Sequence, residues 1–443
     1  MKRITRILCI LAVLLWCCDG CSNPERRGGR GRQVDHGTTE TSESAEETTV
    51  ADDSSETANN STTEEPSPEV AEQPTFTTFN VKLYIENSGS MDGYIDGSPD
   101  FKNSLHSYMS DIQLSGIAEN ISMYFINSQI INKGNNITKF FTGLNSSAAF
   151  RQSGGVRKST DISFVVQKVL ENCASNDVAI IVSDFIFSPG KGKSASKYLD
   201  EQQILLKSVF ADYLKKNPQT GVMFMQLTSN FSGTYYNRED SKTKLKEVER
   251  PYYMLIVGNR NALKSLRDKV PESSIKGSGV KNYFITENNF PSPDYAVQHG
   301  SGDFQRSRTN ATHAIANAKK GRDGNLTFSV NVDFSKSLLD EQYLLSADNY
   351  QLNDKQFAMK VDKNGKKFQL KYSSSVVKKT TLSTKLLKKI PQWIYDFDDE
   401  EGLDINAAPT KTYGLKTIIG GITEAFNFKE DSYYTEITID INK

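Results

Sequence analysis

Apolar runs and helical stripes alternate along the chain from about residue 76 to residue 275. Stripes with apolar residues three or four positions apart, as in 105–112 and 162–169, are typical of amphipathic helices. Short continuous apolar runs are typical of buried strands, and they occupy 81–85, 121–126, 178–182, 222–227 and 252–258. This alternation predicts an α/β fold with a doubly wound, mostly parallel central sheet and helices on both of its faces.

Beyond residue 275 the alternation stops and strand patterns dominate. Strand-like segments lie near 283–286, 326–332 and 356–361, and 433–441 alternates as a final strand. Residues 359–370 predict a hairpin that turns at Asn364-Gly365. One helical stripe covers 415–426, although Gly420-Gly421 weakens it. We expect a smaller α+β or β-sandwich-like domain over 276–443.

Hydroxyls and carboxylates gather where strands of the first region end. The strand at 81–85 is followed by Glu86, Ser88 and Ser90, with Gly89 allowing a tight turn. The strand at 178–182 leads to Asp184, and Thr160 precedes the helix before that strand. Carboxyl ends of neighbouring parallel strands share one edge of a sheet. The sequence therefore predicts an all-oxygen site, which suits Mg²⁺ or Ca²⁺.

These residues, in this order, resemble the metal-ion-dependent adhesion site of von Willebrand factor A domains. That family's motif reads Asp-x-Ser-x-Ser, then Thr, then Asp. The resemblance covers about 76–275 and implies a Rossmann-like fold that binds a protein partner, or a glycan, through a divalent cation. It also implies that an Asp or Glu of the partner completes the metal's coordination. Glu86 departs from the family, since a longer acid stands where the motif has Asp. A site that keeps the fold without binding metal is the alternative.

Four other features of the sequence are candidate sites. The loop 190–194 contains Gly-Lys-Ser but lacks the first glycine of a P-loop, so it is expected to be a flexible basic rim. Asp92 and Asp96 are either an adjacent ion site or solvated loop acids. The acidic stretch 396–402 fails the EF-hand pattern and is expected to be a solvated loop. The histidines, at 36, 106, 299 and 313, form no metal or catalytic motif.

Charge and cysteine content narrow the possible partners. The formal net charge of the 443-residue chain is −1, which gives no electrostatic case for nucleic acid as a partner. Only Cys173 lies in the body of the chain, where it is expected to be a small buried hydrophobe. The body therefore has no internal disulfide and no cysteine-based zinc site.

The first 75 residues read as a targeting segment and a tether. A basic start and an apolar stretch at 7–16 precede Gly20-Cys21. This resembles a bacterial lipoprotein signal, which implies a signal peptide over 1–21, lipidation of Cys21 and a place in the cell envelope. Residues 22–75 are rich in Glu, Asp, Ser and Thr and too poor in apolar residues to fold alone.

The combined expectation is a lipid-anchored envelope protein, periplasmic or surface-exposed. Its domain at 76–275 would bind a partner through a divalent cation held by Glu86, Ser88, Ser90, Thr160 and Asp184. Two alternatives stay open. One is a divalent-metal hydrolase, which needs a general base near the same crevice. The other is a metal-free structural protein that binds through the domain at 276–443.

Overall fold

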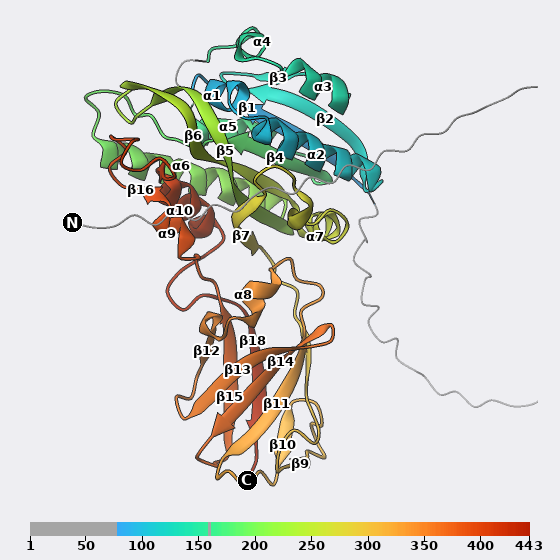
Figure 1. Cartoon of the computed structure of the whole chain (residues 1–443). Helices are drawn as coiled ribbons and strands as arrows, with labels where there is room; N and C mark the ends of the chain where they lie inside the picture. The colour runs from blue at the N-terminus through green and yellow to red at the C-terminus, as the bar shows by residue number, and fades with distance from the viewer. Residues whose placement is uncertain (1–77, 158–160) are drawn as a thin grey trace, which may run out of the picture. The chain divides into compact units, whose positions relative to one another are not determined.

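The computed structural model describes residues 78–157 and 161–443 (Figure 1). Its larger layer is a seven-stranded sheet with the strand order β3-β2-β1-β4-β6-β5-β7. The strands of this sheet are β1 (Phe79–Glu86), β2 (Ala118–Ile126), β3 (Ile130–Asn132), β4 (Asp177–Ser183), β5 (Thr220–Tyr236), β6 (Lys242–Asn259) and β7 (Val280–Glu287). The helices between them are α1 (Asp92–Asp96), α2 (Asp100–Leu114), α3 (Ile137–Gly143), α4 (Ser147–Arg151), α5 (Ile162–Glu171), α6 (Ala195–Lys216) and α7 (Arg260–Lys269).

The sheet is mixed, so the predicted parallel order is only partly correct. β1 pairs in parallel with β2 on one side and with β4 on the other. β6 pairs antiparallel with both β4 and β5, and β7 pairs antiparallel with β5. The apolar runs at 222–227 and 252–258 belong to one long hairpin, because only residues 237–241 connect β5 to β6. A connection this short joins antiparallel strands, whereas a parallel pair needs a longer crossover.

Side chains alternate between the two faces of the sheet, as its central strands require. Val81, Leu83 and Ile85 of β1 enter a core that contains α1, α2 and α7. Tyr84 of the same strand enters a second core, which contains α5 and α6. Helices therefore cover both faces, as the sequence predicts, and the β1 and β4 ends lie between two packed layers (Figure 1).

Residues beyond position 275 also build this layer. β7 is an edge strand of the seven-stranded sheet, and α10 (Leu415–Ala425) packs against α6. Gly421 explains why a glycine pair is tolerated in α10, since a Cβ there would lie 2.5 Å from the Leu206 Cβ. The glycine allows the two helices to approach closely. With α10 lie α9 (Trp393–Asp396) and the short strands β16 (Asp398–Asp399) and β17 (Thr412–Tyr413).

The remaining strands form two further sheets that pack as a sandwich. One has the order β12-β15-β18-β10-β9 and the other β13-β14-β11-β8. Tyr372 of β14 and Thr384 of β15 join the two sheets through hydroxyls 2.8 Å apart. The predicted hairpin is confirmed, with Gly365 at φ +62° in its turn. The strands are β8 (Asp294–Val297), β9 (Gln305–Arg306), β10 (Ala314–Ala316), β11 (Leu326–Asp333), β12 (Tyr350–Leu352), β13 (Phe357–Asn364), β14 (Lys367–Ser374), β15 (Thr380–Leu387) and β18 (Tyr433–Ile441), with the helix α8 (Glu341–Leu345).

The targeting segment predicted over 1–21, with Cys21, and the tether over 22–75 lie outside the described residues. Across 78–157 and 161–443, no helix has both the length and the apolar content needed to cross a bilayer.

Candidate metal-binding site at the ends of β1 and β4

Glu86 and Ser183 are the last residues of two neighbouring parallel strands. β1 and β4 pair in register up to Ile85 and Val182, so Glu86 and Ser183 emerge at the same edge. The Ser183 hydroxyl donates a hydrogen bond to the Glu86 carboxylate and accepts one of 2.8 Å from the Phe185 N–H. Both side chains are buried. The longer acid at position 86 is thus held by its neighbour on β4.

Asp184 follows directly on β4, and the residue is only 3% exposed. The next residue, Phe185, has φ +51°, a left-handed conformation that is unusual for a bulky side chain. Its buried ring packs edge-on against Phe224 at 5.5 Å between centroids, which helps to hold this backbone. Strain of this kind typically costs about 1–3 kcal/mol and concentrates at functional sites.

The loop after β1 brings two hydroxyls to Asp184. The Ser88 and Ser90 hydroxyl oxygens are 3.0 Å apart. The Ser90 side chain acts on Asp184 as a hydrogen-bonding neighbour that lowers the pKa of its carboxyl. Ser90 and Gly89 are partly exposed, so solvent reaches this side of the cluster. Tyr236, near the tip of the β5–β6 hairpin, lies beside Gly89, with its ring 3.5 Å from the position of a Cβ there. Three of the predicted residues, Ser88, Ser90 and Asp184, therefore lie together at this edge of the sheet.

Burial raises the pKa of Asp184 above the usual range for an aspartate. The Ser90 hydroxyl, the charge of Arg250 and the Ile186 N–H act in the opposite direction and stabilise the carboxylate. Burying a carboxylate is costly, so this position favours a nearby positive charge, and the charge of Arg250 acts in that direction.

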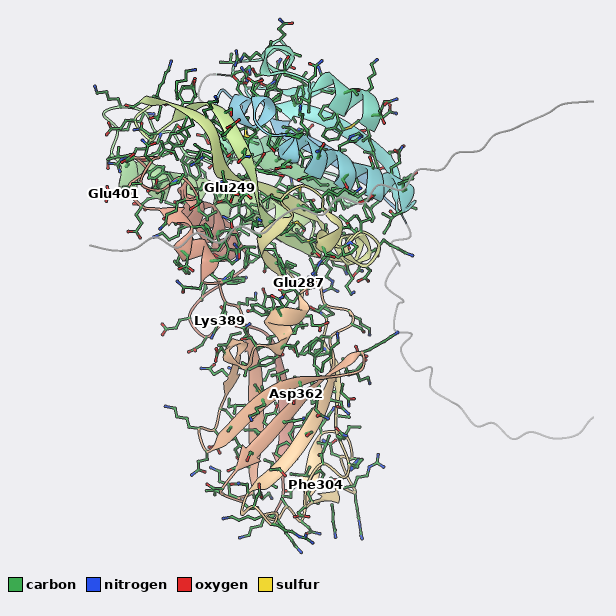
Figure 2. All side chains as sticks on the ribbon, viewed as in Figure 1. Glu249, Glu287, Phe304, Asp362, Lys389 and Glu401 are labelled. Carbon is green, nitrogen blue, oxygen red and sulfur yellow. The ribbon has the colours of Figure 1, made fainter. Side chains whose placement is uncertain are left out.

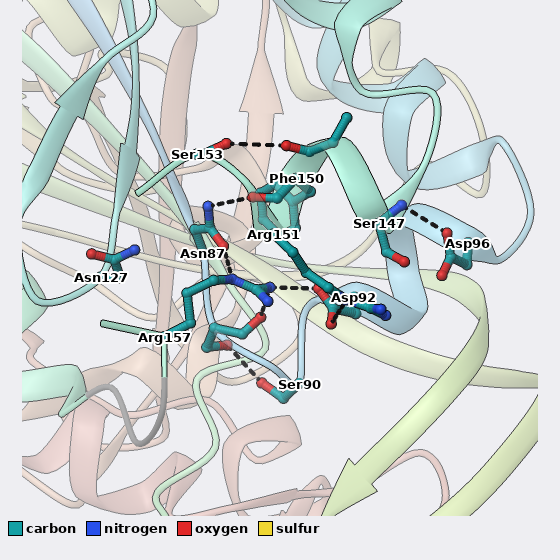
Figure 3. Close-up of polar contacts among 12 residues, drawn as sticks. Asn87, Ser90, Asp92, Asp96, Asn127, Ser147, Phe150, Arg151, Ser153 and Arg157 are labelled. Atoms are coloured by element: carbon teal, nitrogen blue, oxygen red, sulfur yellow. Dashed lines mark hydrogen bonds and ion pairs between the residues drawn. The ribbon is translucent and has the colours of Figure 1, made fainter. Parts of the chain in front are cut away.

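Arg157 holds the loop from the other side. Its guanidinium donates hydrogen bonds to the Asn87 side-chain oxygen, to the Ser88 carbonyl at 2.7 Å and to Asp92 (Figure 3). Asn87 is fully buried and its amide donates to the Phe150 carbonyl at 2.9 Å. Thr160, the fifth predicted residue of the site, lies three positions after Arg157 and outside the described residues.

Arg250 is a buried positively charged residue whose charge acts on Asp184. It is 1% exposed, its Nη1 donates to the Pro409 carbonyl at 2.8 Å, and its guanidinium stacks on the Tyr235 ring at 4.8 Å. Its Nη2 has no hydrogen-bond partner among the described residues. A buried arginine with an unsatisfied nitrogen is unusual, because each such group loses its hydration without compensation.

No protein-family model matches this chain, and no significant match to it was found among curated proteins or solved structures.

Within the described ranges, no group of three or more His, Cys, Asp or Glu side chains is placed to hold a metal ion. The cluster at β1 and β4 is of another kind, since it combines two acids with serine hydroxyls. Such a donor set consists entirely of hard oxygens, which suits Mg²⁺ or Ca²⁺ better than zinc or copper.

The two acidic candidates, Asp92 with Asp96 and the stretch 396–402, contact other parts of the protein in ways that the sequence did not predict. Asp92 pairs with Arg151 at 2.8 Å and with Arg157, and Asp96 accepts from the Ser147 N–H at 2.9 Å, so they bind different partners (Figure 3). The stretch 396–402 is not the expected solvated loop. Asp398 is buried, accepts from the Lys416 N–H at 2.8 Å in the first turn of α10, and pairs with that lysine's ammonium.

The other candidates lie as follows. Lys191 and Lys193 are exposed, and Ser194 caps α6 by accepting from the Lys197 N–H, so the loop 190–194 is a helix entrance with a basic rim. Cys173 is buried beside the Tyr213 hydroxyl, and burial raises its thiol pKa to about 11, which leaves it unreactive.

Sequence reasoning missed Asn87, Ser183, Arg157 and Arg250. Asn87 and Ser183 directly adjoin predicted residues, and their position at strand ends was the available signal. Arg250 closes the polar stretch 242–250, which resembles an exposed strand and gives no hint that its last side chain is buried.

Proposed function

We propose that this protein binds the carboxylate of a partner protein through Mg²⁺ or Ca²⁺ held at the carboxyl ends of β1 and β4. The observation that carries the proposal is the cluster of Asp184, Ser90 and Ser88, in which a buried acid lies beside two neighbouring hydroxyls, that of Ser90 being partly exposed. The resemblance to the von Willebrand factor A motif supports the same reading, with Thr160 as a further expected ligand.

The donor set fits a divalent cation on chemical grounds. Asp184 supplies a buried negative charge whose desolvation a cation offsets, and the serine hydroxyls supply neutral oxygens. Ser183 fixes the orientation of Glu86, so the extra methylene of this acid does not leave its carboxylate unrestrained. When bound, a divalent cation offers an open coordination position that a partner's Asp or Glu fills.

A metal-free role is the second candidate, and the charge of Arg250 favours it. Arg250 already provides a positive charge beside Asp184, so the acid has a counter-charge within the chain. In that case the cluster stabilises the strand ends, and the sandwich formed by β8 to β15 and β18 becomes the binding region. The hydrolase alternative has less support, because His106 stacks on Phe141 and His313 contacts the Tyr295 carbonyl.

Partner capture from native envelopes tests the function. Purified protein is incubated with envelope extract in Mg²⁺ and Ca²⁺, and again with EDTA. We expect a defined partner to be retained only with metal, and lost with Asp184→Asn. Asp177→Asn is the matched control, since Asp177 is equally buried at the opposite end of β4. Capture that survives both EDTA and Asp184→Asn would favour the metal-free role.

We further propose that Cys21 is lipidated and anchors the protein in the cell envelope. The support is the basic and apolar start followed by Gly20-Cys21. Expression of the wild type and of Cys21→Ser, followed by membrane fractionation and mass measurement, tests this. The wild type is expected in the membrane fraction with acyl mass added, and the variant without that mass. An unmodified wild type in the soluble fraction would reject the anchor.

A further inference from the structure

A cavity of about 540 Å³ opens where the edge strand β3 meets α3 and α4. Its lining comes from β2, from the turn after β3, from both helices and from the segment that follows α4. Small-molecule sites in proteins typically have volumes of about 300–1,000 Å³, so this cavity has the size of a ligand site. Glu86, Ser88, Ser90 and Asp184 do not line it, so it is distinct from the cluster at the strand ends.

Part of the cavity wall is a packed group of phenylalanine rings. The Phe125 ring centre lies 5.3 Å from that of Phe140 and 5.0 Å from that of Phe150. All three side chains are buried, as is the neighbouring Leu144. The backbone of Phe150 is held in addition by the Asn87 amide, which donates to its carbonyl. This wall offers a fixed apolar surface to a ligand.

The rest of the lining is polar and basic. Lys133 and Lys139 are exposed, and neither forms an ion pair with a described residue. The Lys133 ammonium lies 5.1 Å from the centre of the Phe125 ring, so a positive charge stands beside the apolar wall. Asn135 is exposed as well, and its side chain has no hydrogen-bond partner among the described residues. None of the described residues that line the cavity is an Asp or Glu, so its lining does not neutralise the lysines.

Two glycines leave space at the cavity. Gly134 and Gly143 both line it, and a Cβ at either position would meet no atom within 4 Å. Gly134 has φ +86°, a left-handed conformation that itself favours glycine. Gly143 is not among the residues with positive φ, so a larger side chain fits its backbone. Position 143 therefore allows the cavity to be filled without backbone strain.

We propose that this cavity binds a small organic anion in which a carboxylate is attached to an apolar or aromatic body. The carboxylate pairs with Lys133 and Lys139, which are positively charged at neutral pH. The body lies against the phenylalanine wall, where it is removed from water. A small inorganic anion would leave this wall uncovered, and a neutral apolar ligand would leave both lysines unpaired. The lining therefore favours a ligand that has both parts.

Defined probes test the ligand class on the full chain. Hexanoate, benzoate and phenylacetate are each compared with their primary amides, and acetate supplies the charge without the body. Ligand-observed NMR and calorimetry measure binding, with EDTA present throughout so that no divalent cation at β1 and β4 can bind the carboxylates. We expect saturable binding of at least one of the three larger carboxylates. Its amide should bind at least about threefold more weakly, because the ion pair with an exposed lysine is lost. Acetate should also bind more weakly, because it covers little of the wall.

Lysine variants test which charges hold the carboxylate. Lys133→Met and Lys139→Met should each weaken carboxylate binding at least about threefold and leave amide binding unchanged. Lys366→Met is the matched control, since Lys366 is an exposed lysine in the turn between β13 and β14. This control should bind the carboxylates as the wild type does. Circular dichroism and thermal melts identify the folded variants before titration.

Filling variants test where the ligand lies. Gly143→Phe should remove binding of acid and amide alike, because its ring occupies the cavity. Ala149→Phe is a second filling variant, at an exposed position of α4 that lines the same cavity.

The inference stands if carboxylate binding is selective over the amides, is weakened in the lysine variants and is lost in the filling variants. It is overturned if none of the three larger carboxylates binds saturably, or if acid and amide bind equally well. Unchanged binding by both folded lysine variants, or by a folded filling variant, also overturns it, because the ligand then lies elsewhere. If neither filling variant folds, the lysine variants decide alone. None of these results depends on metal at the ends of β1 and β4.

Discussion

At the scale of single residues, the acids of the site were predictable from the sequence, but the residues that contact them were not. Asp184 and the two serines were predictable because strand ends and motif spacing fix their place along the chain. The hydrogen bond from Ser183 to Glu86 and the buried state of Arg250 depend on which strands become neighbours. That information is tertiary, so the sequence pattern alone does not contain it.

Arg157 is expected to stabilise the loop more than Arg151, although both pair with Asp92. Arg157 donates to two further oxygens of the loop, whereas the Arg151 side chain is 53% exposed. Arg157→Met should lower the free energy of unfolding by about 1–3 kcal/mol, because buried acceptors lose their donor. Arg151→Met should cost at most about 1 kcal/mol, as an exposed ion pair does. Urea unfolding measures both, and equal losses would contradict the assigned role of Arg157.

At the scale of elements, most strands and helices of the larger layer were predictable from apolar periodicity. The hairpin of β5 and β6 was not, because its polar outer halves, 228–236 and 242–250, carry no strand-like apolar run. The helix α10 was predicted from its apolar stripe despite the glycine pair, but its packing against α6 was not, because the stripe does not say which surface it meets. Its contact with α6 supplies the reason for Gly421.

Gly421→Ala is predicted to destabilise the protein even though alanine is the better helix former. The added methyl group would meet the Leu206 Cβ at 2.5 Å and the Gln203 carbonyl oxygen at 3.0 Å, so α10 and α6 must separate. The clash should outweigh the gain of about 1 kcal/mol in helix propensity. Gly143→Ala, at the exposed end of α3 with nothing within 4 Å, is the control and should be neutral or stabilising. Thermal melts measure the stability of both variants relative to the wild type. A Gly421→Ala protein more stable than the wild type would contradict the close packing of α10 and α6.

At the scale of the whole molecule, one buried acid, Glu287, joins the seven-stranded sheet to the segment between β11 and α8. Glu287, at the end of β7 and labelled in Figure 2, accepts from the Ser337 hydroxyl and the Leu338 N–H, both at 2.8 Å. Its second carboxylate oxygen has no partner among the described residues. The sequence predicted two regions that meet near residue 275. It did not predict this acid at their connection, because nothing in the pattern marks Glu287 as buried.

Stability should fall with rising pH through the titration of Glu287. Burial raises the folded-state pKa of this carboxyl above its value of 4.5 in the unfolded chain. The stabilising contribution is thus complete below that value and is lost as the pH rises through the folded pKa. Glu287→Gln should remove this dependence, so its stability relative to the wild type should increase with pH. Denaturant unfolding between about pH 4 and pH 8 measures the difference. The exposed control Glu430→Gln should show no such trend, and a flat difference for Glu287→Gln would contradict the prediction.

The central claim is that the ends of β1 and β4 hold a divalent cation, and direct calorimetric titration tests it. Metal-depleted wild type, Asp184→Asn and the control Asp177→Asn are each titrated with Mg²⁺ and with Ca²⁺. The account predicts saturable binding of one ion by the wild type and by Asp177→Asn, and its loss in Asp184→Asn. Identical traces for the wild type and Asp184→Asn would show that these strand ends bind no metal, and the cluster would then be structural.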